Sequence, residues 1–492
     1  SRDGEMTFRY VYQYLNCTQP CFRLWISSLT DESVRQGMEN LKPDSCYDSL
    51  FLAADSRNKA DWILGINASY AMCKATGLGN NSLGRVQTPV LAAMHVRNRN
   101  VDTGMRFRSR RYRERENHIS SDSWPIYISL QKDGILFKMR RTQDLPDKES
   151  ATMFFQDCKL SHQAQITGIS HSVKEILPPD LLALTQLQKE ANIRYGYTAS
   201  EVYDIAQSLY EKKLISYPRT SSRYLTEDVF DSLSPIMAHL LSWELFPAAK
   251  GTGGIDISCL SRHVINSEKA NVHHAIIITG IRPGNLSEKE MQVYRLVAGR
   301  MLEAFMAPCR IETTNVEAVC AAQHFKAEQT RIIEAGWHDV FMHSDMVPKS
   351  GYSVNELPEV KKGDNLNVCG CNMVHKKELP VDPFTDAELV EYMEQNGLGT
   401  VSSRTNIIRT LVNRKYIRYS GKYIVPTPKG MFTYETIRGK KIADTSLTAD
   451  WEKQLAGLES GMITGQDFLN RIRTLAKEMT DDIFNTYSTK EE

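Results

Sequence analysis

The chain has 492 residues, enough for roughly three or four domains of about 100–200 residues each. Hydrophobic residues make up 41% and charged residues 24%, an ordinary globular balance, and the formal net charge is +1. No apolar run approaches the roughly 18 residues of a membrane helix, and the ten cysteines show no CxxC…CxxC pattern. These features argue against a membrane protein, a zinc ribbon and a disulfide framework.

The first hundred residues are expected to be mostly helical, with one strand-like apolar run from Phe22 to Ser27. A basic run from Arg106 to Arg115 predicts either a strand with one basic edge or a solvated loop. Residues 126–130 then alternate, Asp133-Gly134 favours a turn, and apolar residues resume at 135–137. This last pattern predicts a β-hairpin.

Residues 180–306 return to a helical pattern, in which Thr198 to Glu201 has the form of a capping box. Strand-like sequence follows at 309–378. A helical segment between two β-rich segments has two explanations. Both β segments form one domain into which the helical segment is inserted, or they form two separate domains.

The last part of the chain, residues 379–492, opens with a second capping box from Thr385 to Glu388. Gly397 predicts the end of that helix, and a second helix is expected at 407–412. Two short apolar segments then flank the turn at Ser420-Gly421. Helix, turn, helix and β-wing is a winged-helix pattern, typical of nucleic-acid binding, and the alternative is a packing module without DNA contact.

Tyr217 follows a predicted helix in the segment Ser216-Tyr217-Pro218-Arg219. Pro218 favours an extended backbone at Tyr217, and residues two apart share one face of an extended segment, so Tyr217 and Arg219 should point the same way. A phenol with a pKa of about 10 is a poor nucleophile and needs a nearby cation. A guanidinium also suits phosphate oxygens. The alternative is a buried tyrosine beside a surface arginine.

His273 and His274 precede an apolar stretch. A histidine can donate to a phosphate or protonate a leaving oxygen. Paired histidines can also be metal ligands or structural residues, although no HExxH pattern or third ligand stands nearby.

The segment from Gly79 to Arg85 nearly matches a P-loop, but Arg85 replaces the lysine and Val86 replaces the hydroxyl that binds Mg²⁺. The sequence therefore argues against ATP binding. We expect a polar strip facing DNA, with Arg85 on phosphate and Gln87 on a sugar or base edge.

Together these motifs resemble those of type IA DNA topoisomerases, and within them the bacterial topoisomerase III branch. The resemblance covers nearly the whole chain and is carried, in the family's order, by Arg23 to Ser27, Ser82 to Pro89, Ser216 to Thr220 and His273 to Thr279. It implies that Tyr217 is the nucleophile that takes a 5′-phosphate. Arg219 and His273 are the implied contacts to the scissile phosphate. The implied groove for single-stranded DNA is lined by Ser82, Leu83, Gly84, Arg85, Val86, Gln87, Arg57, Asp61 and Arg404.

The implied fold is multidomain α+β, a torus with winged-helix (CAP-like) domains and a β-rich hinge domain, with the N-terminal Toprim domain mostly missing. Residues 1–31 are the expected Toprim remnant. The expected domains are 32–100 with 379–492 as the helical and winged-helix DNA-groove domain, 101–178 with 309–378 as the hinge domain, and 179–308 as the inserted active-site domain that carries Tyr217.

The chain departs from the family's motifs at several positions. Ser1 stands near the second acid of the family's Mg²⁺ motif and Asp3 at the third, so we expect a chain truncated within the Toprim domain. Asp3 and Glu5 are then a partial metal site, because closely spaced carboxylates suit Mg²⁺. Ser221 replaces an aspartate and Ile278 a proline.

The resemblance predicts a topoisomerase that cleaves and reseals one DNA strand through a 5′-phosphotyrosine intermediate, and so relaxes or decatenates underwound DNA. It implies Mg²⁺ in the intact parent protein, but neither ATP nor zinc. The expected partners are single-stranded or underwound DNA and a RecQ-like helicase, and the expected form is a monomer in the bacterial cytoplasm. The alternative is a truncated, catalytically impaired body that binds single-stranded DNA. A tyrosine recombinase or relaxase would need an Arg/His cluster or a three-histidine site, and neither pattern is present.

Overall fold

The computed structural model describes residues 2–26, 31–77, 79, 81–102, 123–243, 245–246, 262–270, 273–341, 353–354, 356–376 and 382–488. The basic run from Arg106 to Arg115 lies outside these residues. Within them, no helix has both the length and the apolar character needed to span a membrane.

The first part of the chain is mainly helical. Its elements are α1 (Arg2–Tyr14), β1 (Phe22–Arg23), α2 (Asp31–Glu39), β2 (Lys42–Pro43), the 3₁₀ turn η1 (Asp44–Tyr47), α3 (Asp48–Thr76) and α4 (Gln87–Asp102). The strand expected at 22–27 is confirmed only for its first two residues, which pair with β2. The long helix α3 packs against α1 and against two helices from the other end of the chain.

A closed barrel is formed by strands from both β-rich segments. Its strands are β3 (Ile126–Lys132), β4 (Ile135–Arg141), β5 (Gln163–Ile176), β6 (Cys309–Cys320), β7 (Gln323–Glu334) and β8 (Asn365–Met373), in the order β3-β4-β7-β6-β5-β8. Helix α5 (Lys148–Leu160) packs beside β8, and the 3₁₀ turn η4 (Gly336–Asp339) follows β7. The predicted hairpin is confirmed: Asp133 and Gly134 both have positive φ, as a tight turn between twisted strands requires. Of the two explanations for the β segments, the structure shows a single barrel.

A helical unit, here called the insert (residues 181–305), leaves the barrel at the end of β5 and returns at the start of β6. Ile176 and Cys309 are cross-strand partners, so the insert is an excursion between two adjacent strands. Its helices are α6 (Leu184–Tyr195), α7 (Ala199–Glu211), α8 (Glu227–Asp231), α9 (Leu233–Ser242) and α10 (Glu288–Phe305).

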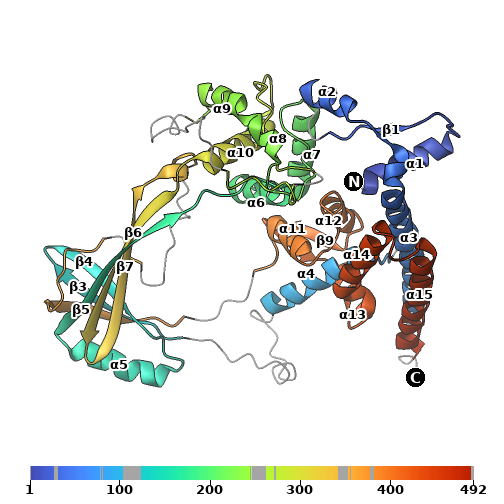
Figure 1. The fold of residues 1–492 in the computed structure, drawn as a ribbon. Helices are drawn as coiled ribbons and strands as arrows, with labels where there is room; N and C mark the ends of the chain where they lie inside the picture. The colour runs from blue at the N-terminus through green and yellow to red at the C-terminus, as the bar shows by residue number, and fades with distance from the viewer. Residues whose placement is uncertain are drawn as a thin grey trace.

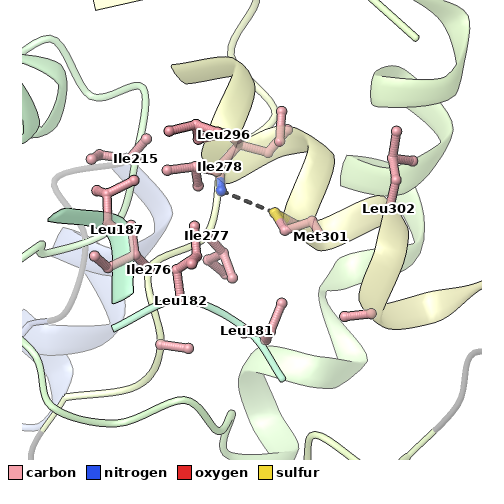
Figure 2. Packing of buried hydrophobic residues seen from close by; sticks show 14 of the residues in the cluster. Leu181, Leu182, Leu187, Ile215, Ile276, Ile277, Ile278, Leu296, Met301 and Leu302 are labelled. Carbon is pink, nitrogen blue, oxygen red and sulfur yellow. Dashed lines mark hydrogen bonds between the residues drawn. The ribbon is translucent and has the colours of Figure 1, made fainter. Parts of the chain in front are cut away.

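The core of the insert is built around the apolar segment at 276–278, which lies among leucines from α6 and α10 (Figure 2). The Ile278 amide donates to the Met301 sulfur at 3.1 Å. The segment that follows His274 is therefore fixed in the interior, and it fixes the position of the histidines before it.

The last part of the chain completes two helical units. Its elements are α11 (Asp386–Gln395), α12 (Arg404–Asn413), β9 (Ile417–Ser420), β10 (Tyr423–Pro426), α13 (Pro428–Ile437), the 3₁₀ turn η5 (Lys441–Ala443), α14 (Ser446–Glu459) and α15 (Gly465–Ser488). Here we call α4, α11, α12, α13 and the β9–β10 hairpin the hairpin unit, and α1, α3, α14 and α15 the helical body. Both predicted capping boxes, at Thr198 and at Thr385, are confirmed.

These units follow one another around a ring (Figure 1). The barrel leads into the insert, α2 lies beside α7 of the insert, and α1 lies beside α3 of the helical body. The hairpin unit lies between the helical body and the insert. The ring is thus closed by contacts between segments that are far apart in the sequence.

Candidate active site

Tyr217 and His273 are brought together by the pairing of residues 214–216 with 277–279. The Ser216 amide donates to the Ile277 carbonyl at 2.8 Å, and the Ser216 Oγ accepts from the Ile277 amide at 3.0 Å. On the far side of Tyr217, the Thr220 hydroxyl donates to the His273 carbonyl at 3.0 Å. Hydrogen bonds on both sides of Tyr217 therefore hold it beside His273.

The Tyr217 ring lies in an aromatic setting. Its centroid is 4.6 Å from that of the His273 ring, with the two planes tilted by 47°. The Tyr210 ring of α7 meets it edge-on at 5.4 Å. Burial, followed by the neighbouring Tyr217 phenol, raises the pKa of Tyr210. Tyr210 therefore stays uncharged and lines one side of the site.

Arg219 lies against the same helix. Its guanidinium carbon is 5.1 Å from the centroid of the Tyr203 ring, and its Nη2 donates to Gln207 Oε1 at 3.1 Å. Tyr203, Gln207 and Tyr210 follow helical spacing along one face of α7, so Tyr217 and Arg219 lie along that face together. The Arg219 Nε is buried and has no hydrogen-bond partner among the described residues. A buried unpaired donor of this kind suits an anion such as a phosphate.

His273 carries a second unpaired polar atom. Its Nδ1 is buried and has no hydrogen-bond partner among the described residues. Burial lowers the pKa of His273 to about 4, so the ring is neutral at neutral pH. Its neighbour His274 is buried more deeply, with Nδ1 2.6 Å from the Ala275 carbonyl oxygen. His274 therefore has a structural contact, and His273 is the histidine that faces Tyr217.

The predicted DNA strip is a turn that ends where α4 begins at Gln87. Arg414 of the hairpin unit donates to the Ser82 Oγ at 2.6 Å and to the Gln87 Oε1 at 3.0 Å. The Ser82 amide donates to the Tyr416 hydroxyl at 2.6 Å. Leu83 is buried in the helical body, Val86 is half-buried against the core of the hairpin unit, and Gly84 lies beside the Gln87 side chain.

Arg85 differs from the sequence prediction, because only 6% of its surface is exposed. Its Nε donates to Asp61 Oδ1 at 2.8 Å, its Nη1 lies 3.4 Å from Glu452 Oε1, and its guanidinium stacks over the Trp451 ring at 4.6 Å. Arg85 and Asp61 therefore link α3 to α14. In this structure Arg85 does not present its charge to solvent as a phosphate contact would require.

Arg57 and Arg404 are also engaged within the protein. Arg57 forms an ion pair with Asp3. Arg404 is buried, and its Nη1 donates to Glu394 Oε1 at 3.1 Å and to the Thr185 hydroxyl at 3.4 Å. Burial lowers the pKa of Arg404 despite the attraction of Glu394. In this structure Arg404 therefore joins α12 to α6, and its predicted contact with DNA stays a prediction.

Asp3 and Glu5, the expected partial metal site, are both paired with arginines in this structure. Glu5 is 7% exposed, and both of its oxygens accept hydrogen bonds at 2.8 Å from Arg9 or Arg23. Burial opposes ionisation, but the bonds from Arg23 and Arg9 outweigh it and lower the pKa of Glu5. Among the described residues, no group of three or more potential ligands could hold a metal ion. Asp3 and Glu5 therefore do not fit a Mg²⁺ site.

Several residues around Tyr217 were missed by the sequence reasoning. The aromatic and polar face of Tyr203, Gln207 and Tyr210 runs beside the apolar stripe of α7, and its helical spacing was visible in the sequence. Trp25 lies within a recognised motif, but its contact with His273 was not predicted: the two rings are nearly parallel, at 13°, with centroids 6.1 Å apart. No local pattern indicates this pairing.

The fold and the sequence agree on one class of protein. The structure is similar to that of full-length topoisomerase I from Thermotoga maritima, with a TM-score of 0.73 over 98% of this chain and 76% of that one; at 21% identity this likeness establishes the fold of a type IA topoisomerase. A sequence model described as DNA topoisomerase matches residues 45–470. The chain is 31% identical to DNA topoisomerase 3 of Bacillus licheniformis, over 98% of this chain and 67% of the relative. It is 30% identical to DNA topoisomerase 3 of Bacillus subtilis, over 99% and 68%.

The chain therefore belongs to the type IA DNA topoisomerase family, a family of isomerases. DNA is the substrate expected of such a protein.

Proposed function

We propose that Tyr217 is the nucleophile of a strand-cleavage reaction. The phenol gives its proton to water as its oxygen attacks a phosphodiester and forms a bond to the 5′-phosphate of one fragment, while the 3′-oxygen of the other fragment leaves and takes up a proton from water. The reverse attack by that 3′-hydroxyl reseals the strand and frees Tyr217. The observation that carries this proposal is the contact of the Tyr217 ring with His273, together with two buried nitrogens, His273 Nδ1 and Arg219 Nε, that have no hydrogen-bond partner among the described residues.

The two nitrogens have different roles. The negative charge that develops on the attacked phosphate needs a cation, and the guanidinium of Arg219 supplies one. His273 is neutral in the free protein, because its pKa is lowered to about 4. It therefore serves as a neutral hydrogen-bond donor to a phosphate oxygen, and Arg219 supplies the positive charge.

We place single-stranded DNA beside the turn at Ser82 to Gln87 and the adjoining hairpin unit. Helices α11 and α12 and the β9–β10 hairpin follow the order of a winged helix, a form typical of nucleic-acid binding. Arg414 contacts both ends of the Ser82–Gln87 turn, which makes this face a place where backbone phosphates could bind.

Strand passage requires the ring to open, and the joint between the insert and the hairpin unit is suited to reversible opening. Arg409 Nη2 lies 2.8 Å from Asp204 Oδ2 across this joint, and Lys189 Nζ lies 2.8 Å from Glu391. Partly exposed ion pairs each contribute about 0–1 kcal/mol. The buried contacts of the same joint, Arg404 with Thr185 and Asp386 with the Ala199 amide, must also separate when it opens. The closed barrel would act as the hinge.

The steps above use residues of this chain alone. Mg²⁺ would support resealing by neutralising phosphate charge, but Asp3 and Glu5 do not fit an ion, and no step is assigned to it. A RecQ-like helicase partner, a monomeric state and a cytoplasmic location rest on the resemblance and stay predictions.

A cleavage assay tests the proposal. The protein is incubated with labelled single-stranded DNA, the mixture is quenched with denaturant, and protein-linked label is measured. The wild-type protein should retain label, and Tyr217→Phe, which lacks only the attacking hydroxyl, should retain none while binding the DNA equally well. Equal label in both variants would refute the assignment of Tyr217.

A second candidate function is favoured by the arginines that pair with Asp3 and Glu5. In that case the chain binds single-stranded DNA without completing the reaction. The same assay separates the two candidate functions. If wild type and Tyr217→Phe both bind DNA and neither retains label, the chain binds DNA without cleaving it.

A further inference from the structure

We infer that Trp25 is a positioning residue that holds the imidazole of His273 against Tyr217. The inference rests on the proposed function and adds a residue to it. The Trp25 and His273 rings are stacked within 13° of parallel at a centroid distance of 6.1 Å, within the usual range of aromatic pairs. Trp25 also stacks on Tyr47, at 5.7 Å and 7°.

His273 needs such a contact because no hydrogen bond from a described residue holds the Nδ1 of its ring. Its backbone is held through the Thr220 hydroxyl, but its Nδ1 has no partner among the described residues. The Tyr217 ring contacts it, but Tyr217 must shift as its oxygen becomes bonded to phosphorus. A ring contact that does not take part in the chemistry can keep the imidazole in place during this shift.

Trp25 and His273 belong to different structural units of the protein. The neighbouring Arg23 is held by the Glu5 carboxylate of α1 at 2.8 Å, and Tyr47 leads directly into α3. Trp25 is therefore anchored to the helical body, whereas His273 is fixed in the insert. An ion pair between Lys213 of the insert and Asp31 of α2, at 3.0 Å, spans the same joint, where α2 lies beside α7 (Figure 1).

Cleavage and resealing at Tyr217 are thereby coupled to closure of the ring that the structural units form. When the insert lies against α2, Trp25 covers His273 and the site beside Tyr217 is complete. When the insert moves away, the indole leaves His273, water reaches the imidazole, and resealing slows until the ring closes again. The contact thus favours resealing after passage of the other strand.

Trp25 can be replaced without hollowing out a core, because it is 40% exposed. Trp25→Ala should lower the single-turnover rate of covalent adduct formation about tenfold, with the dissociation constant for the same oligonucleotide within twofold of wild type. Trp25→Phe keeps an aromatic ring and should recover most of the rate. Phe22→Ala, an exposed aromatic change on β1 of the same segment, is the matched control and should leave the rate unchanged.

A second readout does not require DNA cleavage. The His273 imidazole is titrated by NMR in wild type and in both Trp25 variants. Besides burial, the charges that act on His273 are those of the chain's amino terminus and of the adjoining His274, while Tyr217 contacts its ring, and none of these groups is altered. Loss of the indole exposes the imidazole to water, so Trp25→Ala should raise the pKa of His273 from about 4 toward its ordinary 6.5, and Trp25→Phe should not.

These outcomes separate the inference from the proposed function. If wild-type protein forms no adduct, the proposed cleavage activity is refuted. The role of Trp25 is then tested by the NMR titration of His273 alone. An unchanged titration in Trp25→Ala overturns the inference, and so does a rate loss shared by Phe22→Ala or matched by an equal loss of DNA binding. A raised pKa with a lower rate, restored by phenylalanine, supports it.

Discussion

The rings of Tyr217 and His273 lie with their centroids 4.6 Å apart, although the two residues belong to separate segments of the insert. The relationship depends on the backbone pairing of residues 214–216 with 277–279 and on the Thr220 hydroxyl bond to the His273 carbonyl. It places a neutral donor beside the proposed nucleophile, and it leaves Arg219 as the nearby positive charge.

Replacement of Arg219 should slow cleavage without preventing DNA binding. Loss of a charged donor to a developing phosphate charge typically lowers the rate about 100- to 1000-fold, and this is the effect expected for Arg219→Ala. Arg219→Lys keeps the charge but not the planar fork, so an intermediate rate is expected. The measurement is single-turnover adduct formation at saturating DNA.

Arg223→Ala is the matched control for Arg219, because its half-exposed side chain lies in the same segment and pairs with Asp180, at 3.7 Å. A full rate in Arg219→Ala, or the same loss in Arg223→Ala, would contradict the assigned role.

Folding stability should depend on pH through His273. Its pKa is about 4 in the folded protein against an ordinary 6.5, so the unfolded chain binds a proton between these values that the folded chain does not. The stability that the neutral ring allows is complete above about pH 6.5 and is lost as the pH falls toward 4. His273→Gln should therefore flatten the melting temperature against pH in this window.

Burial also lowers the pKa of His274, which should leave a residual slope of the same sign. His171→Gln, on the exposed part of the barrel strand β5, serves as the control and should keep the wild-type slope. An unaltered slope in His273→Gln would show that the imidazole is not buried in the neutral form.

Arg85 should prove structural rather than a direct DNA contact. Arg85→Ala removes the ion pair with Asp61, one of the two arginines that pair with Glu452, and the stacking on Trp451, and should lower the free energy of unfolding by about 2 kcal/mol. Gln87→Ala should instead weaken binding of single-stranded DNA and lower the melting temperature less than Arg85→Ala does, although it loses the bonds to Arg414 and Ser82. Thermal unfolding and fluorescence anisotropy measure the two effects. If Arg85→Ala weakened DNA binding without lowering stability, and Gln87→Ala lowered stability without weakening binding, Arg85 would be assigned to the DNA-binding surface instead.

The joint between the insert and the hairpin unit should loosen when Arg409 is removed. Arg409 donates from Nε to the Ser200 hydroxyl at 2.9 Å and pairs with Asp204, and both partners lie on the first turns of α7. Loss of about 1 kcal/mol corresponds to roughly fivefold faster local opening. Hydrogen exchange should therefore speed up in α7 and α12 of Arg409→Ala but not in the barrel.

Arg310→Ala removes an ion pair of similar exposure within the barrel and is the control for Arg409. If both variants speed exchange in α7 equally, the joint between the insert and the hairpin unit has no special part in opening.

Short-range features of this fold were predictable from the sequence because the residues that determine them are neighbours in the chain. The capping boxes at Thr198 and Thr385 each need a hydroxyl and a carboxylate three residues apart, and both are formed. The hairpin turn at Asp133-Gly134 needs two residues that tolerate positive φ, and it too is formed. Membership of the topoisomerase family was likewise predictable, because its motifs are short and ordered.

Contacts between distant segments could not be predicted in the same way. The charge of Arg85 suggested a phosphate, but its burial depends on Glu452 and Trp451 from the other end of the chain. The carboxylate of Glu5 suggested a metal, but two arginines occupy its oxygens. In both cases the side-chain type was compatible with two partners, and only the tertiary packing selects between them.

The measurement that tests the central claim most directly is the location of the covalent bond on both protein and DNA. Wild-type protein is incubated with an oligonucleotide labelled at either the 5′ or the 3′ end, denatured and digested, and the modified peptide is identified by mass spectrometry. Attack on a 5′-phosphate predicts that only the 3′-end label stays with the protein, on the peptide that contains Tyr217. Retention of the 5′-end label, or attachment to any other residue, would contradict the account.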